Sequence, residues 1–245
     1  MPEFFTEYHK LDDVPGYGIF GAVHIGWLLA SALMIFLLCL WFRRLKPESR
    51  RLTEKIIGCS MVVLEALKIL ILYLGDSMDV SYLPLHLCGI SIFICAFRAF
   101  FPIKTASELM YCVCMPGALM ALLFPNWIEI YPFFNYFNLY SILIHVLIVA
   151  MPLMLVCAGD IKPNVRNLWK CALVLLAFAL LIHPINLKFS TNFMFTVRPS
   201  AGSPLEWFEK LWGNPGYLLG FPICAAVLWT VMYLPFSLKS KKNKE

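Results

Sequence analysis

Long apolar runs separated by short polar stretches dominate the chain from residue 19 to residue 237. Each run is close to the ~20 residues that a helix needs to cross the hydrocarbon core of a bilayer. The runs predict seven transmembrane helices, at about 19–42, 56–75, 82–102, 105–124, 137–158, 167–186 and 217–237. We therefore expect an all-α, multi-pass protein of the cell membrane with a single domain, residues 1–245.

Charged residues between the runs indicate how the chain is oriented. The loops after the first, third and fifth runs and the tail 238–245 are basic. On the opposite side, the loops with Asp76 and Glu129 and the segment 1–18, with Asp12 and Asp13, are mainly acidic, and the loop 187–216 is mixed. Lys and Arg concentrate in cytoplasmic loops. We therefore expect residues 1–18 outside and the basic tail in the cytoplasm, and we find no removable signal peptide.

Two segments on the predicted outer side are rich in aromatic residues. Residues 125–140 are expected to form a belt or lid at the membrane interface. The outer loop 187–216 contains Trp207, Phe208 and Trp212 and is expected to carry a short interfacial helix.

Composition agrees with a membrane protein and narrows its chemistry. The chain is 60% hydrophobic and 14% charged, against about 25% charged residues in soluble domains. Its net charge of +5 is confined to loops and tail, so no nucleic-acid partner is expected. The nine cysteines form no CxxC pair, and Cys112-x-Cys114 has no partner pair, so no metal is expected. No cofactor is expected either.

Ionisable residues within the runs gather in the predicted outer half of the bilayer. At 1.5 Å per residue, their approximate depths from the outer end are ~5 Å for His183, ~6 Å for His86, ~8 Å for His24, ~10 Å for Lys68, ~12 Å for His145 and ~15 Å for Glu65. The predicted inner half has almost none beyond the interfacial Arg98, Glu108 and Lys170. This asymmetry predicts a polar pocket open to the outer leaflet or to the outside.

Several of these residues allow two interpretations. Glu65 and Lys68, three residues apart on one helix face, neutralise each other or also brace a histidine. His24 and His183 fit interhelical hydrogen bonds. His145 lies deeper, and His86 lies between a proline and a thiol. Both fit a direct functional role, because histidine serves as a general base near neutral pH.

Cys88 is a candidate nucleophile. In a continuous helix it lies about 200° round from His86, so no dyad within that helix is expected, whereas a pair with His145 is open. Cys95 follows seven residues later on the same face, so a packing seam fits the pattern equally well.

Four stretches resemble the YwaF-type integral membrane proteins: Leu83-Pro-Leu-His-Leu-Cys88, Gly117–Pro125, His145, and Asn186 with Thr191–Phe195. Those proteins share a family with the animal transmembrane protein 164, an acyltransferase acting on ether phospholipids. The resemblance implies a seven-helix fold and, in the animal branch, acyl transfer through a cysteine thiol. It matches His86, His145 and Glu65 by position. The thiol departs from the pattern, because Leu85 stands where the animal branch has cysteine, and Cys88 lies about 4.5 Å further along a helix.

These observations favour an enzyme of lipid acyl chains, a transacylase, acyltransferase or hydrolase, whose partner is a phospholipid or lysophospholipid. His86 or His145 is expected to act as general base, the other histidine to orient or stabilise the oxyanion, and Cys88 or a histidine-activated water to attack. The pocket is expected to include Glu65, Lys68, His24, His183, Asn186 and Asn192.

The alternative is a transporter or small-molecule-binding protein with an outward-facing polar cavity, in which the prolines and the Glu65/Lys68 pair serve gating. The lack of an evident inverted repeat disfavours it. A third hypothesis is a structural or accessory role for another membrane protein.

Overall fold

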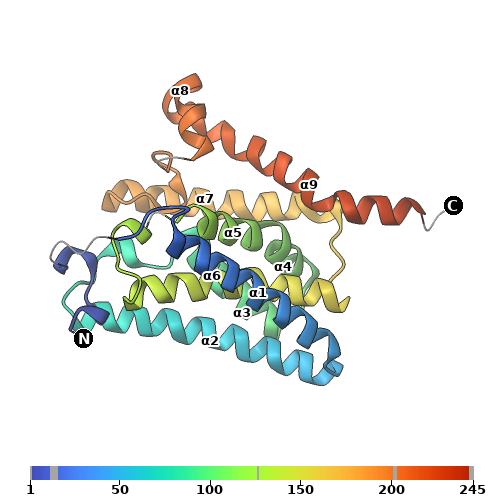
Figure 1. Ribbon diagram of the computed structural model, residues 1–245. Helices are drawn as coiled ribbons and strands as arrows, with labels where there is room; N and C mark the ends of the chain where they lie inside the picture. The colour runs from blue at the N-terminus through green and yellow to red at the C-terminus, as the bar shows by residue number, and fades with distance from the viewer. Residues whose placement is uncertain (1, 12–15, 126, 201–202, 243–245) are drawn as a thin grey trace. The chain divides into compact units, whose positions relative to one another are not determined.

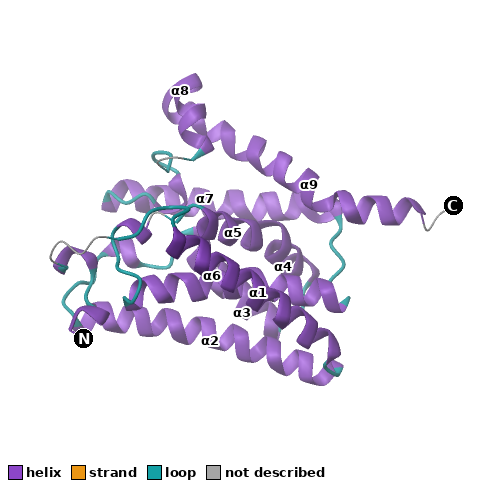
Figure 2. Cartoon of the chain, viewed as in Figure 1, coloured by secondary structure: helices purple, strands orange, loops and turns teal. Residues whose placement is uncertain are grey.

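The computed structural model describes residues 2–11, 16–125, 127–200 and 203–242. These residues form helices and loops, and no strand occurs among them (Figure 2). Asp12, Asp13 and the side chains of the lysine-rich tail, on which part of the predicted orientation rests, lie outside the described residues.

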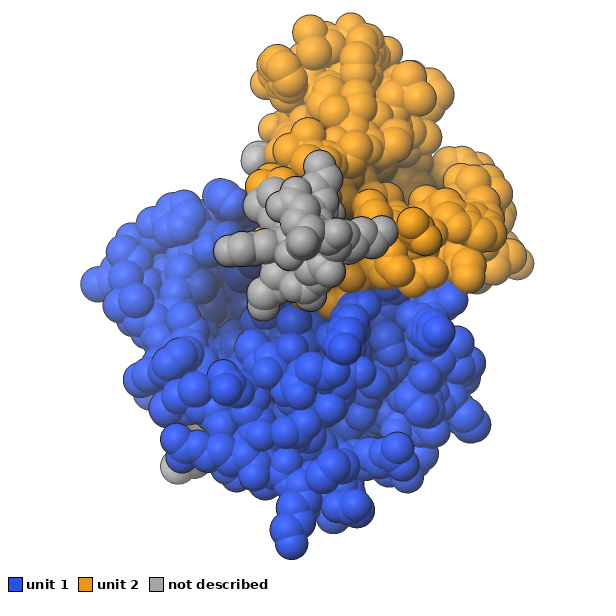
Figure 3. All heavy atoms as spheres, turned by 90° about the vertical axis from the view of Figure 1, so that its right-hand side faces the viewer, with its two compact units in different colours: residues 1–162 blue, residues 163–245 orange. Residues whose placement is uncertain are grey.

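The chain folds as two compact units, residues 1–162 and 163–245, which Figure 3 colours separately. The α-helices of the first unit are α1 (Ala22–Arg44), α2 (Pro47–Leu74), α3 (Leu87–Phe100), α4 (Lys104–Leu109), α5 (Met115–Leu123) and α6 (Tyr136–Ala158). A π-helix, η4 (Met110–Cys114), joins α4 to α5. The first unit also contains the 3₁₀ turns η1 (Pro2–Phe5), η2 (Tyr8–Lys10), η3 (Val80–Tyr82) and η5 (Trp127–Glu129).

The second unit contains α7 (Leu168–Phe189), α8 (Pro204–Gly216) and α9 (Gly220–Lys242), with 3₁₀ turns η6 (Val165–Asn167), η7 (Phe193–Phe195) and η8 (Tyr217–Leu219). The helix expected within the loop 187–216 is α8. On it Trp207 is 63% exposed and Phe208 is buried against Tyr217, as an amphipathic helix requires.

Six helical stretches of the described residues are long and apolar enough to cross a membrane: Ala22–Arg44, Pro47–Leu74, Lys104–Glu129, Tyr136–Ala158, Val165–Phe189 and Pro204–Phe236. The all-helical, multi-pass character is thus confirmed. The count of seven spans, the orientation of the ends and the single domain stay predictions.

The third expected span is shorter than its apolar run. The run at 82–102 yields a helix only from Leu87 to Phe100. Pro84 has no N–H to donate and restricts the residue before it, and Leu85 N–H instead bonds the carbonyl of Leu83 at 2.7 Å in a tight turn. The predicted start of this span was wrong by about one helical turn.

The second span, by contrast, begins earlier than expected. Pro47 occupies the first turn of α2, where its fixed φ suits a helix and its missing N–H costs nothing. Arg50 therefore lies on a helix rather than in a loop. Its guanidinium donates to the carbonyls of Arg43 (2.7 Å) and Ala158 (3.3 Å) and to Asp160 (3.1 Å), which ties α2 to the ends of α1 and α6.

Helix α6 is the central element of the first unit, because it packs against α1, α2, α3 and α5 (Figure 1). At the Arg50 end of the unit, α2 and α3 are also joined by a buried ion pair between Glu54 and Arg98. Arg98 Nε donates to the hydroxyl of Ser107 on α4 at 3.1 Å. Glu54, which precedes the predicted second span in the sequence, thus lies on α2 and neutralises the Arg98 guanidinium. The predicted asymmetry of polar groups across the bilayer stays a prediction.

Candidate functional site

The residues Leu83–His86 form a turn that leads into α3. His86 is the residue before the helix, with extended backbone (φ −68°, ψ 156°), and Cys88 is the second helical residue. A Cβ on Gly89 would lie 2.7 Å from the backbone of Pro84, so the turn lies against the first helical turn only because residue 89 is glycine. The angular separation of His86 and Cys88 that a continuous helix predicts is therefore wrong.

The start of α3 offers unsatisfied amide groups to this region. The first backbone bond of the helix runs from Ile90 N–H to the carbonyl of His86, at 3.0 Å. The preceding N–H groups, including that of Cys88, have no carbonyl one turn back to bond. His86 occupies the capping position, but its side chain makes no capping hydrogen bond to these amides. Cys88 is the second residue of this helix, where the helix N-terminus carries partial positive charge.

Glu65 anchors a buried cluster between α2 and α6. It is 4% exposed, and its Oε1 lies 2.7 Å from Lys68 Nζ. Its Oε2 accepts the hydroxyl hydrogen bond of Tyr140. Lys68 Nζ also donates to the carbonyl of Tyr82 at 3.2 Å and lies 5.4 Å from the centre of the Tyr140 ring. The ion pair therefore does more than neutralise itself, since it connects α2, α6 and the turn before α3.

The same cluster reaches the two motif residues. Lys68 Nζ bonds the carbonyl of Tyr82, which directly precedes the turn Leu83–His86, and Cys88 follows that turn on α3. We call Glu65, Lys68, His86, Cys88 and Tyr140 the polar cluster. Sequence reasoning singled out all of them except Tyr140. Its only signal was a hydroxyl within the first turns of an apolar run, which indicates a membrane interface equally well.

His145 occupies a different face of α6. It lies five residues, about 140° round the helix, from Tyr140. Its Nδ1 donates to the carbonyl of Ser141 at 2.6 Å, so in the neutral ring Nε2 carries the lone pair. The ring of Trp127 stacks on it. No hydrogen bond within the described part of the chain joins His145 to Cys88, so the structure does not form the pair that the sequence left open.

Both ring nitrogens of His24 form hydrogen bonds. The residue is fully buried. Nδ1 accepts the N–H of Phe20 at 2.8 Å, and Nε2 donates to the carbonyl of Leu122 at 3.0 Å. These bonds join α1 to the end of α5, which is the interhelical role that the sequence allowed, and they occupy both nitrogens.

Asn186, in the second unit, organises the loop after α7. Its amide donates to the carbonyl of Phe193 (2.8 Å) and the hydroxyl of Thr196 (2.9 Å), and its Oδ1 accepts from Thr191 (2.8 Å) and from Phe193 N–H (2.8 Å). His183 Nδ1 lies 3.3 Å from the same Thr196 hydroxyl. All four hydrogen-bonding capacities of the Asn186 amide are used within the loop.

Asn192 has a similar position in this loop. Its Oδ1 accepts the N–H groups of Val197 and Arg198, both at 3.2 Å, and its amide donates to the carbonyl of Arg198 at 2.9 Å. The loop bends through left-handed backbone at Met194 and Phe195 (φ 53° and 54°). Places for His183, Asn186 and Asn192 in a substrate pocket stay predictions.

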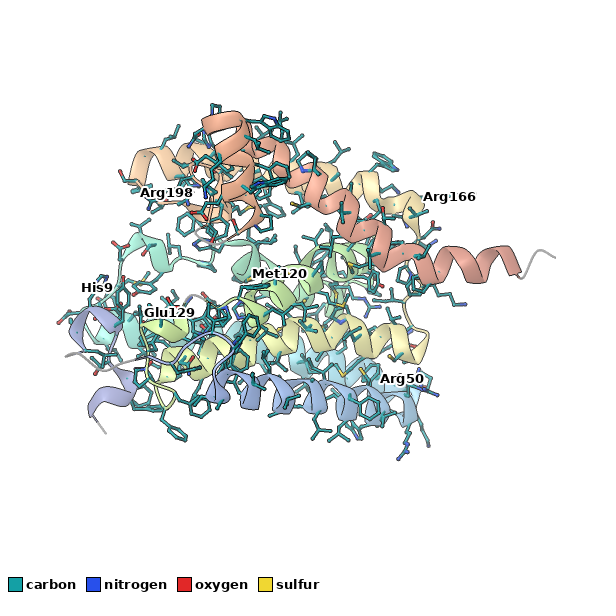
Figure 4. The ribbon with its side chains drawn as sticks, turned by 45° about the horizontal axis from the view of Figure 1, so that its top comes forward. His9, Arg50, Met120, Glu129, Arg166 and Arg198 are labelled. Carbon is teal, nitrogen blue, oxygen red and sulfur yellow. The ribbon has the colours of Figure 1, made fainter. Side chains whose placement is uncertain are left out.

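Other features of the first unit bear on ligands. Across the described ranges, no three His, Cys, Asp or Glu side chains are grouped as a metal site would need. A cavity of about 100 Å³ lies at the end of the unit that carries the N-terminus, with Glu7, Lys10, Leu72 and Phe137 among its lining. Figure 4 shows His9 and Glu129 at this end and Arg50 at the other.

The chain matches the TMEM164 family over residues 19–233 and therefore belongs to that family. The match includes the polar cluster, His145 and the loop after α7. No curated protein and no solved structure matches the chain.

Proposed function

We propose, from membership of the TMEM164 family together with the polar cluster, that this chain is a membrane-embedded enzyme that transfers or hydrolyses phospholipid acyl chains. The observation that carries the proposal is the position of Cys88. Cys88 is the second residue of α3, two residues after His86 at the capping position, and Lys68 of the polar cluster bonds the carbonyl of Tyr82 just before the turn that leads into this helix. A thiol, a neighbouring base and free amide donors are the groups that acyl transfer requires.

In the proposed reaction, His86 takes the proton of the Cys88 thiol, and the thiolate sulfur attacks the ester carbonyl of a phospholipid. The C–O bond of the tetrahedral intermediate then breaks. The lysophospholipid leaves as an alcohol with the proton from His86, and the acyl group remains on Cys88 as a thioester. A hydroxyl of an acceptor lysophospholipid, or a water, attacks that thioester and restores the thiol.

The remaining cluster residues have roles in charge stabilisation. The free amides at the start of α3 and the ammonium of Lys68 stabilise the oxyanion that develops on the ester carbonyl. Glu65 and Tyr140 hold Lys68 in place through the ion pair and the aromatic face. His145, with its Nε2 lone pair, is assigned to deprotonate the acceptor hydroxyl, a role different from the orientation or oxyanion stabilisation expected of the second histidine from the sequence.

The test uses purified protein in phosphatidylcholine liposomes with a labelled lysophospholipid, and follows both acylation and release of free fatty acid. We expect turnover by the wild type and a loss of roughly 100-fold or more in Cys88→Ser, His86→Gln and His145→Ala. Cys157→Ser is the matched control, because this thiol is exposed at the far end of α6, and it should keep the wild-type rate.

Each other outcome has a defined meaning. Loss of turnover in the histidine variants with full activity in Cys88→Ser would contradict the thioester and leave a histidine-activated water. If no form turns over while the protein remains folded, the enzyme proposal is wrong. Solute uptake and binding would then test the transporter or small-molecule-binding alternative, with its outward-facing polar cavity.

A further inference from the structure

The N-terminal residues 4–11, which we call the strap, are tied to the first unit at several points. Lys10 Nζ donates to the carbonyls of Gly75 (2.6 Å) and Asp76 (3.0 Å) just past α2, where a cation is stabilised by the helix C-terminus. The carbonyl of Thr6 accepts from the Asn135 amide at 3.0 Å. The strap is therefore anchored to the ends of α2 and α6.

Glu7 is the buried residue of the strap. It is 3% exposed, and its Oε2 accepts the N–H of His9 at 2.9 Å. Its other oxygen accepts the hydroxyl hydrogen bond of Tyr82. A buried carboxylate is stable only when its oxygens are hydrogen-bonded, so the Tyr82 hydroxyl is held where Glu7 is held.

Tyr82 links the strap to the polar cluster. Its hydroxyl donates to Glu7, and its backbone carbonyl accepts from Lys68 Nζ at 3.2 Å. It ends the short 3₁₀ turn η3, between α2 and α3, where its N–H bonds the carbonyl of Asp79 at 3.1 Å. The Glu7–Tyr82 bond is a contact between residues 75 apart in the chain, and it ties this turn to the strap.

We propose that Glu7 and Tyr82 are positioning residues of the acyl-transfer site. Glu7 of the strap fixes Tyr82, and the Tyr82 carbonyl fixes the Lys68 ammonium beside His86. This inference rests on the proposed function. Without the carbonyl, Lys68 keeps its ion pair with Glu65 and its contact with the Tyr140 ring but loses the bond that holds it toward the turn before α3, and it moves away from the developing oxyanion. The loss falls on the chemical step, whereas the lipid surface that binds substrate is unchanged.

The kinetic experiment compares Tyr82→Phe, Glu7→Leu and Glu7→Gln in the liposome assay. We expect Tyr82→Phe and Glu7→Leu to lower kcat about tenfold with little change in KM. Glu7→Gln should retain most activity, because its amide oxygen still accepts from Tyr82. Lys10→Met is the matched control, since it removes a strap anchor that does not touch Tyr82, and its kcat should stay within about twofold of the wild type.

A second readout is independent of turnover. Hydrogen–deuterium exchange of the full-length protein should be faster at residues 83–90 in Tyr82→Phe and Glu7→Leu, and unchanged there in Glu7→Gln and Lys10→Met. Unchanged exchange in α6 shows that each variant is folded. If the wild type proves inactive, the proposed function fails, and the exchange experiment still tests the contact. Wild-type exchange at 83–90 in Tyr82→Phe and Glu7→Leu would overturn the inference, as would equal losses of kcat in Lys10→Met and Glu7→Leu.

Discussion

The indole ring of Trp127 lies parallel to the imidazole ring of His145, with 5.1 Å between the ring centres and 10° between the planes. The carbonyl of Ser141 accepts from Nδ1 of the same histidine. One contact fixes the plane of the ring, and the other fixes which nitrogen carries the proton. A base held in this way needs no reorientation before it accepts a proton.

Removing the indole should therefore slow the reaction assigned to His145. We expect Trp127→Ala to lower the turnover of the liposome assay about tenfold, and Trp127→Phe to lower it less, because a flat ring remains. Trp41→Ala, at an exposed tryptophan of α1, is the control. Wild-type turnover in Trp127→Ala would show that the stack has no part in the reaction.

The approach of Pro84 to Gly89 predicts a loss of stability on adding one methyl group. A Cβ at residue 89 would meet backbone atoms at 2.7 Å, so Gly89→Ala should lower the free energy of unfolding by about 1–3 kcal/mol. Gly26→Ala is the matched control, because nothing lies within 4 Å of its Cβ, and it should be neutral or stabilising by up to ~1 kcal/mol. Thermal unfolding in detergent measures both, and equal midpoints for the two variants would refute the close approach.

The buried pair of Glu54 and Arg98 predicts a non-additive effect. Arg98→Met alone leaves an unpaired buried carboxylate and should cost about 3–5 kcal/mol. Combining it with Glu54→Leu removes that charge, so the double variant should recover most of the loss. Thermal midpoints of the two single variants and the double variant give the coupling, and additive losses would mean that the charges do not interact.

Stability should fall at alkaline pH. Burial, and then the hydrogen bond to Glu7, raise the pKa of Tyr82 above its usual value, and burial and the Glu7 charge raise the pKa of Tyr131. The folded state thus favours the neutral phenols. Their contribution is complete below the unfolded pKa of about 10 and is lost as the pH rises above it. The temperature midpoint of thermal unfolding should decrease as the pH is raised from about 9 to about 11, and it should decrease less steeply in Tyr82→Phe. Equal slopes for the wild type and Tyr82→Phe would contradict this assignment.

Features that depend on local sequence were predictable. The run at 137–158 became Tyr136–Ala158, and the run at 19–42 became Ala22–Arg44, because the length and hydropathy of a span are properties of one segment. Pro84 carried a signal for the late start of α3, but the apolar residues around it favoured a continuous helix.

Features that depend on packing were not predictable. Glu54 and Arg98 are 44 residues apart, and no spacing rule pairs them. Trp127 was expected only in an aromatic belt, since its contact with His145 exists once η5 and α6 are packed. For the site, the sequence could name a histidine and a thiol, but the turn that places them at a helix start had to come from the structure.

The length of α3 has a consequence for what reaches Cys88. Fourteen residues rise about 21 Å, roughly 9 Å less than the ~30 Å hydrocarbon core. If α3 is the third predicted span, the irregular backbone of Leu83–His86 takes up the missing depth, and such backbone is tolerated there only inside protein or beside water. We then expect a local interruption of the bilayer beside the thiol. We expect water to enter this gap from one side while acyl esters approach from the lipid, so that two solvents meet at a single sulfur atom.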